Sequence, residues 1–221
     1  MSPNQEPPKS YEGTPAYLLV PARTRLTRIY SVQFGVTEFN PTVAKSPFAG
    51  GRFDANENDE YAFLYAADDD RTAISEAVLR DLPINERGAR LLPRARFSGL
   101  KISWLVTNLD MQLVSLRSGE DLASVGQDAW LTVAPPTEYP VTRRWASAIR
   151  TWAPEAAGLT WRSLREPAGF AFVFFSDRCE RGAFAESRDD LPVPTGEQEM
   201  DAGPARVYVE EILVRYRVAL M

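Results

Sequence analysis

The sequence contains no histidine, one cysteine (Cys179) and three lysines among its 221 residues. Without histidine, a Ser-His-Asp or Cys-His nucleophile system is excluded, and so is a metal site with histidine ligands. A single cysteine excludes an intramolecular disulfide and a structural zinc site built on cysteines. Any chemistry must therefore come from carboxylates, arginines, hydroxyls and tyrosines, and we expect no metal ion.

Long apolar runs and an excess of positive charge are also lacking. No apolar stretch approaches the roughly 18 residues that cross a bilayer, and residues 1–10 lack the basic and apolar segments of a signal peptide. The chain is therefore predicted to be cytoplasmic, with no membrane contact. Lys and Arg total 25 against 30 Asp and Glu, a net charge of −5. Direct binding of nucleic acid, which normally requires a basic excess or stripe, is not expected.

The remaining composition is that of a folded globular chain, with 44% hydrophobic and 25% charged residues. Residues 1–16 are polar and proline-rich and are predicted to form a flexible N-terminal arm. Residues 187–204 are acidic and rich in proline and glycine, which indicates a surface loop. Residues 17–221 show no internal repeat and no boundary, so they are predicted to form a single domain. A monomer and a homo-oligomer are both compatible with the sequence.

Apolar patterning predicts six strands. They are short runs rich in aromatic and β-branched residues, at residues 26–32, 61–66, 100–106, 111–116, 169–176 and 207–218. The run at 169–176 is apolar on both faces and is expected at the centre of a sheet. Asn108 and Asp110 predict a hairpin between the third and fourth strands.

Two helices are also predicted. One follows the carboxylates of residues 68–70, which suit a helix N-terminus, and is expected to end near Pro83. The other covers residues 142–152, where Trp145, Ile149 and Trp152 form one apolar face. Since strands outnumber helices and do not alternate with them, the predicted class is α+β.

Two segments in the first quarter of the chain bring an arginine to a potential ligand. Arg28 and Tyr30 lie in a predicted strand, where Arg28 would present a fixed cation; a solvated strand arginine is the alternative. In residues 50–53 (GGRF), two glycines allow the backbone to approach a ligand and Arg52 adds charge. A tight turn with an exposed arginine would have the same sequence.

Two further segments carry a carboxylate and hydroxyls. Tyr65 ends a predicted strand, and Glu76 lies eleven residues later on the following helix, off its apolar stripe. Glu76 and Arg80 could equally form an ordinary surface pair at i, i+4. Ser163 lies in a predicted loop, residues 158–163, that leads into the central strand. It can position a ligand or be a simple turn serine, and no histidine is present to activate it.

In combination and in this order, the four segments resemble the RES-domain family, named after arginine, glutamate and serine residues. The family pattern has a Gly-Gly-Arg-aromatic turn, an aliphatic strand ending in tyrosine, and a helix with alanine and then glutamate. Residues 50–76 match it as GGRF…FLYAADDDRTAISE. Residues 142–152 and the stretch GLTWRSLREPAGFAFVFF are similar to the family's helix, serine loop and final core strand. The resemblance covers about two-thirds of the chain, from about residue 26 to residue 176.

The resemblance implies an ADP-ribosyltransferase-like fold of mixed sheets with flanking helices, as in diphtheria-type toxins. It also implies a toxin-type enzyme that degrades NAD⁺, an NAD⁺ phosphorylase or an NAD⁺ glycohydrolase, with phosphate or water accepting the ADP-ribose. NAD⁺ is then the substrate, phosphate a second substrate, and no cofactor is implied. Many members of the family are paired with a helix-turn-helix antitoxin that covers the active site, so a cognate antitoxin is an expected partner.

The same resemblance assigns seven site residues: Glu76, Arg28 and Ser163 as catalytic, and Arg52, Tyr65, Gly51 and Tyr30 as substrate-binding. Cleavage of the nicotinamide–ribose bond passes through an oxocarbenium-like state that needs geometry and charge rather than a strong nucleophile. Glu76 would bind the ribose hydroxyls and stabilise the developing cation. Arg28 and Arg52 would hold the pyrophosphate or the attacking phosphate. Tyr65 would stack on nicotinamide, and Ser163 would position a phosphate or ribose oxygen.

Two alternatives use the same residues. An ADP-ribosyltransferase would differ only in transferring ADP-ribose to a protein. A catalytically inactive module that binds a nucleotide or an antitoxin would release no nicotinamide.

Overall fold

The computed structural model describes residues 6–44 and 50–221, and it confirms the α+β class. The strands are β1 (Tyr17–Val20), β2 (Arg25–Ser31), β3 (Phe63–Ala67), β4 (Arg90–Leu92), β5 (Leu100–Thr107), β6 (Met111–Leu116), β7 (Gly158–Arg162), β8 (Phe170–Phe175), β9 (Phe184–Glu186) and β10 (Val218–Leu220). The helices are α1 (Asp70–Ile74), α2 (Gly119–Ser124), α3 (Trp130–Val133), α4 (Tyr139–Trp152) and α5 (Gly203–Arg215). A π-helical turn, Ser75–Leu79, continues α1, and 3-10 turns lie at Arg94–Phe97 and Pro136–Glu138.

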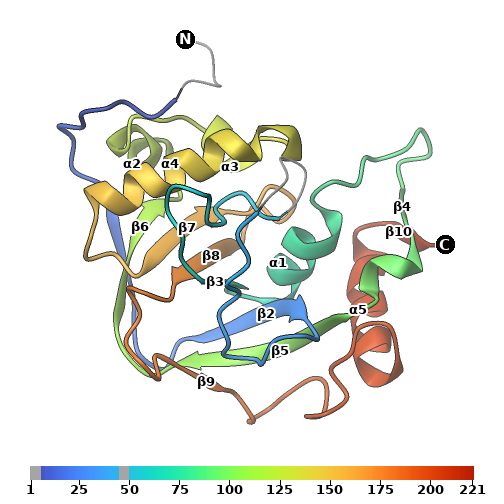
Figure 1. Ribbon diagram of the computed structural model, residues 1–221. Helices are drawn as coiled ribbons and strands as arrows, with labels where there is room; N and C mark the ends of the chain where they lie inside the picture. Colours follow the sequence, from blue (N-terminus) through green and yellow to red (C-terminus); the bar gives the residue numbers. More distant parts are fainter. Residues whose placement is uncertain (1–5, 45–49) are drawn as a thin grey trace.

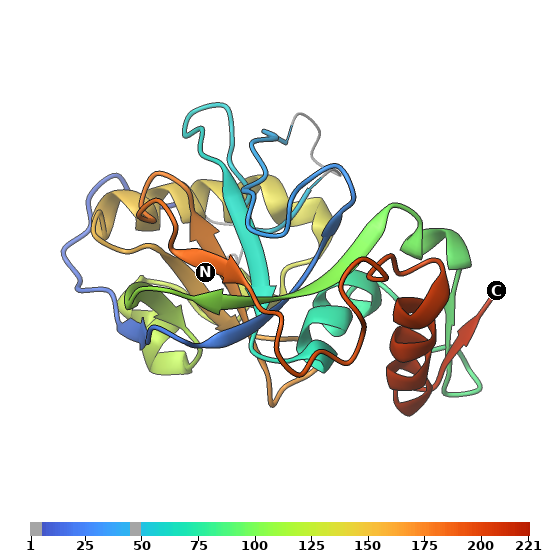
Figure 2. The ribbon, with the colours of Figure 1, turned by 90° about the horizontal axis from the view of Figure 1, so that it is seen from below.

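Most strands belong to one sheet in the order β1-β6-β7-β8-β3-β2-β5-β9, and β10 pairs with β4 in a separate small sheet. Neighbours in the large sheet are antiparallel except β6 and β7. Helices α2, α3 and α4 lie over the β6-β7-β8 side of the sheet (Figure 1). Helix α5 and the small sheet lie together at the other end of the molecule (Figures 1 and 2).

Two of the buried apolar clusters pack these helices against the sheet. Under α4, Trp145 and Ile149 of the helix belong to the same buried cluster as Trp161 and Val173 of the sheet. The helix begins at Tyr139, three residues before the predicted start, because a proline is tolerated in a first helical turn. A second cluster brings together the turn after α1, strand β5 and helix α5.

Five of the six predicted strands are confirmed to within two residues, as β2, β3, β5, β6 and β8. Strand β8 lies between β7 and β3, so the apolar run does occupy the middle of the sheet. The predicted hairpin between β5 and β6 is wrong, since β5 pairs with β2 and β9 while β6 pairs with β1 and β7. Its turn residues bind other segments instead: the Asn108 side chain donates to the Gly182 carbonyl, and Asp110 accepts from the Ala22 amide.

The strand predicted at residues 207–218 is also wrong, because this stretch is mostly helix α5. Its buried residues Ala205, Val209, Ile212 and Leu213 recur at helical spacing and pack into the second cluster. The high content of β-branched residues favours a strand locally, but burial of this stripe outweighs that preference. At the end of this stretch, Val218–Leu220 does pair as a strand, parallel to β4.

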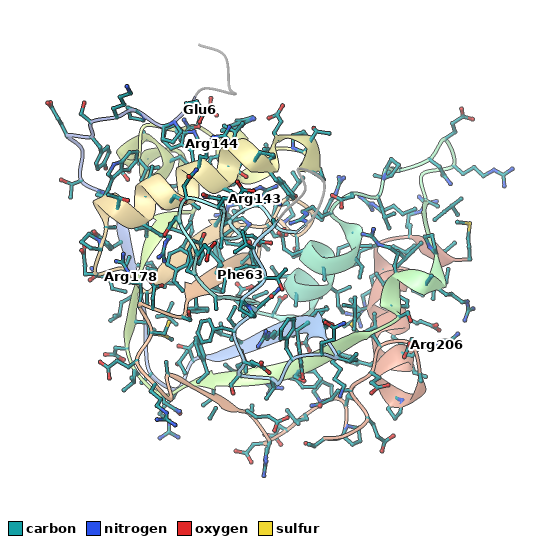
Figure 3. All side chains as sticks on the ribbon, in the orientation of Figure 1. Glu6, Phe63, Arg143, Arg144, Arg178 and Arg206 are labelled. Atoms are coloured by element: carbon teal, nitrogen blue, oxygen red, sulfur yellow. The ribbon has the colours of Figure 1, made fainter. Side chains whose placement is uncertain are left out.

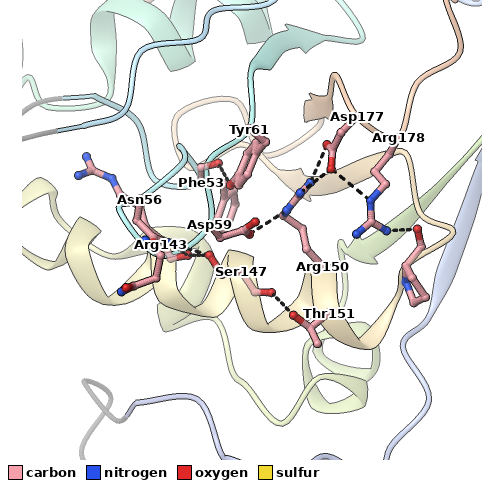
Figure 4. A network of polar contacts seen from close by, with 12 residues as sticks. Phe53, Asn56, Asp59, Tyr61, Arg143, Ser147, Arg150, Thr151, Asp177 and Arg178 are labelled. Carbon is pink, nitrogen blue, oxygen red and sulfur yellow. Dashed lines mark hydrogen bonds and ion pairs between the residues drawn. The ribbon is translucent and has the colours of Figure 1, made fainter.

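The loop that leads into β3 is held against α4 by a buried arginine (Figure 4). Arg150 Nε donates to Asp59, and its two terminal nitrogens donate to Asp177, at 2.9–3.2 Å. The guanidinium also lies 3.9 Å from the Tyr61 ring centroid and 4.4 Å from that of Phe175. One side chain therefore joins the helix, the loop and the end of β8.

Residues 6–16 of the predicted N-terminal arm contain no helix or strand, but they contact α4 and α2. Arg144 binds Glu6 through two hydrogen bonds of 2.6 Å, near the top of the view in Figure 3. The Tyr11 ring stacks on Trp152 at 4.1 Å. The division into an arm and a single domain stays a prediction, and residues 1–5 lie outside the described residues.

The predicted surface loop at residues 187–204 contains no helix or strand until Gly203, where α5 begins. Val193 and Met200 of this segment are buried in the second cluster. The loop therefore covers the end of the sheet next to α5.

Candidate functional site

A cavity of about 410 Å³ opens where β2 and β3 separate. The two strands share a single register pair, Thr27 with Ala67, whereas β2 pairs with β5 over its whole length. The walls come from both strands, from α1 with its π-helical turn, and from the glycine turn at residues 50–51. The volume falls in the range of small-molecule sites.

Glu76 lies in the π-helical turn and lines this cavity. Asp69 is the N-cap of α1, and its carboxylate accepts from the Thr72 amide, so the predicted acidic helix start is confirmed. Turns of the π type are rare and occur frequently at functional sites. Among the described residues no ion pair joins Glu76 to Arg80, so the alternative of an ordinary surface pair does not describe it.

Ser163 reaches Glu76 from behind the cavity wall. Its hydroxyl donates to Glu76 Oε1 at 2.7 Å and accepts from the Glu166 amide at 3.3 Å. The predicted loop before it is wrong: Gly158–Arg162 is strand β7, held between β6 and β8. Gly169 ends the turn after Ser163. A larger residue does not fit there, because a Cβ would lie 1.8 Å from the Thr72 hydroxyl. The serine and the glutamate, 87 residues apart, thus meet through a close approach of this turn to α1.

The glycine turn and Tyr65 are joined by Asp54, which the sequence did not single out. Asp54 accepts from the Gly51 amide at 2.7 Å and from the Tyr65 hydroxyl at 2.8 Å, and the Phe53 amide donates to Tyr65. A Cβ on Gly51 would lie 2.6 Å from Asp54 and 2.7 Å from the Tyr65 oxygen. Burial raises the pKa of the Asp54 carboxyl and also raises the pKa of Tyr65. The tyrosine ring at the cavity wall is therefore fixed in orientation.

Tyr30 also lines the cavity, whereas Arg28 does not. The Tyr30 hydroxyl shares a hydrogen bond of 3.0 Å with Ser103. The Arg28 guanidinium packs 4.7 Å from the Tyr30 ring and donates to the Val36 carbonyl at 2.6 Å. Burial lowers the pKa of Arg28 to about 10. Arg28 therefore braces the loop after β2 and does not line the cavity.

Arg52 is 2% exposed and lies behind the glycine turn, outside the cavity lining. It donates to the Ala134 carbonyl at 3.0 Å, and its guanidinium lies 5.5 Å from the Tyr139 ring centroid. Burial lowers the pKa of its guanidinium. An exposed turn arginine, the alternative given by its sequence, is therefore wrong.

Of the seven residues predicted for the site, four line the cavity: Tyr30, Gly51, Tyr65 and Glu76. Ser163 touches one of them, and Arg28 and Arg52 lie in the surrounding wall. The arginine that lines the cavity among the described residues is Arg80, for which the sequence indicates only a surface pair with Glu76. Its spacing of one helical turn from Glu76 was the available signal.

The described parts of the chain offer no group of three or more His, Cys, Asp or Glu side chains able to hold a metal ion. In residues 6–44 and 50–221, every helix is too short or too polar to cross a membrane.

Comparison with known proteins gives one family and one fold. The family model described as the RES domain matches residues 25–195. A comparison with curated proteins found no match. Among solved structures, the fold is similar to a chain in the crystal structure of the M. tuberculosis MbcT-MbcA toxin-antitoxin complex, with a TM-score of 0.57. The two are 14% identical, and the match covers 89% of this chain and 92% of the other. At 14% identity this likeness is evidence for the fold alone.

Proposed function

The chain belongs to the RES-domain family, because the family model matches well over half of it, and we propose that it is a toxin-type enzyme that cleaves NAD⁺ at the nicotinamide–ribose bond. The observation that carries the proposal is a glutamate, Glu76, that lines a cavity of small-molecule size and is oriented by a buried serine. This chemistry needs a carboxylate and polar side chains that position the substrate, and the cavity contains both.

In the proposed reaction, the bond between nicotinamide and ribose C1′ breaks and its electron pair leaves with neutral nicotinamide. An oxygen of phosphate or water forms the new bond to C1′, giving a phosphorylated ADP-ribose or free ADP-ribose, and water releases one proton. The transition state carries positive charge on the ribose. A fixed carboxylate stabilises that charge more strongly than water does, because it needs no reorientation as the charge develops.

The remaining residues have supporting roles in this proposal. Ser163 engages one oxygen of Glu76, which leaves the other for the ribose hydroxyls. Tyr65, anchored by Asp54, offers a ring face to the nicotinamide. Arg28 and Arg52, buried behind the wall, hold the loops that shape the cavity.

A partner is proposed on the same basis. The similar fold occurs in a structure described as a toxin-antitoxin complex, and the family resemblance implies a helix-turn-helix antitoxin. We infer that such an antitoxin would cover the opening of the cavity.

The proposal is tested by incubating the purified full chain with NAD⁺, with and without inorganic phosphate, and identifying the products by mass spectrometry. We expect release of nicotinamide, together with a phosphorylated ADP-ribose if phosphate is the acceptor or free ADP-ribose if water is. Absence of nicotinamide release from folded protein without a bound partner would contradict the proposal. Labelled ADP-ribose on a protein acceptor instead would favour a transferase.

The serine contact makes a separate prediction. Ser163→Ala removes the donor to Glu76 at a buried position, so the carboxylate loses its fixed orientation. We expect kcat for nicotinamide release to fall about tenfold, the effect of losing one hydrogen bond to a charged group. Steady-state kinetics on Ser163→Ala and on Ser176→Ala, a serine outside the cavity, would measure it. Equal rates in the two variants would show that the contact does not matter.

A further inference from the structure

Arg80 is the one arginine or lysine among the described residues that line the cavity. It lies one residue beyond the π-helical turn and four residues after Glu76. Side chains four residues apart on a helix are neighbours on its surface. The cavity therefore presents a cation beside the carboxylate that would face the ribose.

The guanidinium of Arg80 packs on a buried aromatic ring, that of Tyr139 at the start of α4. Its carbon Cζ lies 5.1 Å from the centroid of that ring, and Arg52 lies 5.5 Å from the same centroid. The Thr142 hydroxyl donates to the Arg52 carbonyl at 2.7 Å, which ties the glycine turn to the same helix. Two guanidinium groups thus converge on one ring next to the cavity.

Among the described residues, neither guanidinium of this pair forms a hydrogen-bonded ion pair with a carboxylate, although Glu76 and Asp81 lie near enough to act on the charge of Arg80. Arg52 is 2% exposed, and within the described residues it forms no ion pair with a carboxylate. The closest carboxylate contact of Arg80 is Asp81, at 3.7 Å and partly exposed. The Nε atoms of both arginines are buried and have no hydrogen-bond partner. Buried donors of this kind are normally satisfied. The Nε atom of Arg80 has only the 3.7 Å contact with Asp81, which leaves it able to donate to an anion.

We propose that Arg80, backed by Arg52 and Tyr139, binds a phosphate oxyanion in the cavity. The inference rests on the proposed function and names a group for it that the family resemblance did not assign. The ligand is either the diphosphate of NAD⁺ or the inorganic phosphate that attacks the ribose. Guanidinium groups bind phosphate through two parallel hydrogen bonds, and a cation here also offsets the repulsion between Glu76 and an incoming phosphate.

The test compares Arg80→Gln and Arg80→Lys with the wild-type chain and with Arg71→Gln. Arg71 lies on α1, its side chain is 52% exposed and it is outside the cavity lining, which makes it a matched control. Binding of ADP and, separately, of inorganic phosphate is measured by isothermal titration calorimetry. The KM values for NAD⁺ and for phosphate in nicotinamide release are measured in parallel.

We expect Arg80→Gln to weaken binding of one of the two probes roughly ten- to hundredfold, and Arg71→Gln to leave both unchanged. Weaker ADP binding with a raised KM for NAD⁺ would identify the diphosphate. Weaker phosphate binding with a raised KM for phosphate would identify the acceptor. Arg80→Lys keeps the charge but loses the planar fork, so a smaller loss is expected from it. If Arg80→Gln does not fold, the affinities of Arg80→Lys for the two probes test the inference instead.

Unchanged affinity for both probes in folded Arg80 variants would overturn the inference, and so would failure of the wild-type chain to bind either probe. Calorimetry separates this result from the proposed function. A wild-type chain that binds ADP through Arg80 but releases no nicotinamide would contradict the NAD⁺-cleaving activity and leave the phosphate site standing. Nicotinamide release that is unaffected by substitution of Arg80 would support the NAD⁺-cleaving activity and contradict the phosphate site.

Discussion

Replacing Glu76 by glutamine is expected to lower kcat for nicotinamide release by about a hundred- to a thousandfold, with little change in KM. The amide keeps the shape of the side chain and can still accept the hydrogen bond from Ser163, so the fold and the cavity are preserved. What is lost is the negative charge opposite the ribose. That charge matters chiefly in the transition state, when the ribose becomes cationic, and this is why the effect falls on kcat.

The measurement is steady-state nicotinamide release by the wild-type chain, Glu76→Gln and Glu120→Gln. Glu120 is an exposed glutamate in the first turn of α2, so the control makes the same chemical change outside the cavity. Thermal unfolding of the three proteins verifies that they are folded. Wild-type turnover in Glu76→Gln would remove Glu76 from the reaction, even if NAD⁺ cleavage itself were established.

Replacing Arg150 by leucine is expected to reduce the free energy of unfolding by about 3 kcal/mol, because it leaves Asp59 and Asp177 without their cation. The Arg150 side chain is 5% exposed, whereas the two carboxylates are 28% and 45% exposed and can be partly rehydrated. The effect should therefore lie at the low end of that for a broken buried pair. The contact with Tyr61 and Phe175 is lost as well. For a chain of this length we expect Tm to fall by about 6–12 °C.

Arg144→Leu provides the comparison, since Arg144 lies on the same helix and also binds a carboxylate. Its side chain is 40% exposed and that of Glu6 is 60% exposed, so the loss should be under about 1 kcal/mol. Urea unfolding monitored by tryptophan fluorescence would measure both variants. Equal destabilisation by the two substitutions would mean that burial of the Arg150 network contributes nothing to stability.

These two residues illustrate different levels of predictability. Glu76 stands in a recognisable order of motifs, and its exclusion from the apolar stripe of its helix was visible in the sequence. Arg150 carries no such pattern, because both of its carboxylate partners are distant in the chain: Asp59 lies before β3 and Asp177 follows β8. A charged residue within an amphipathic helix looks solvent-exposed until the packed loop above it is known.

The arginines in and around the site also differ in how far the sequence predicts their positions. The resemblance pointed to Arg28 and Arg52 because they stand in its motifs, yet both are buried in the wall. The cavity that Arg80 lines opens where β2 and β3 separate beyond Thr27 and Ala67, and a strand separation of this kind has no local sequence signature.

The sequence by itself determined which chemistry was available, since the absence of histidine left carboxylates, arginines and hydroxyls. It also determined five strands of the sheet, the helix at α4 and the family, because apolar periodicity and motif order are local properties of the chain. Only the tertiary structure decided that residues 203–215 are helical, that β5 and β6 do not pair, and that Ser163 meets Glu76. Each of these depends on contacts between segments far apart in the chain, where burial of a shared apolar face outweighs local preference.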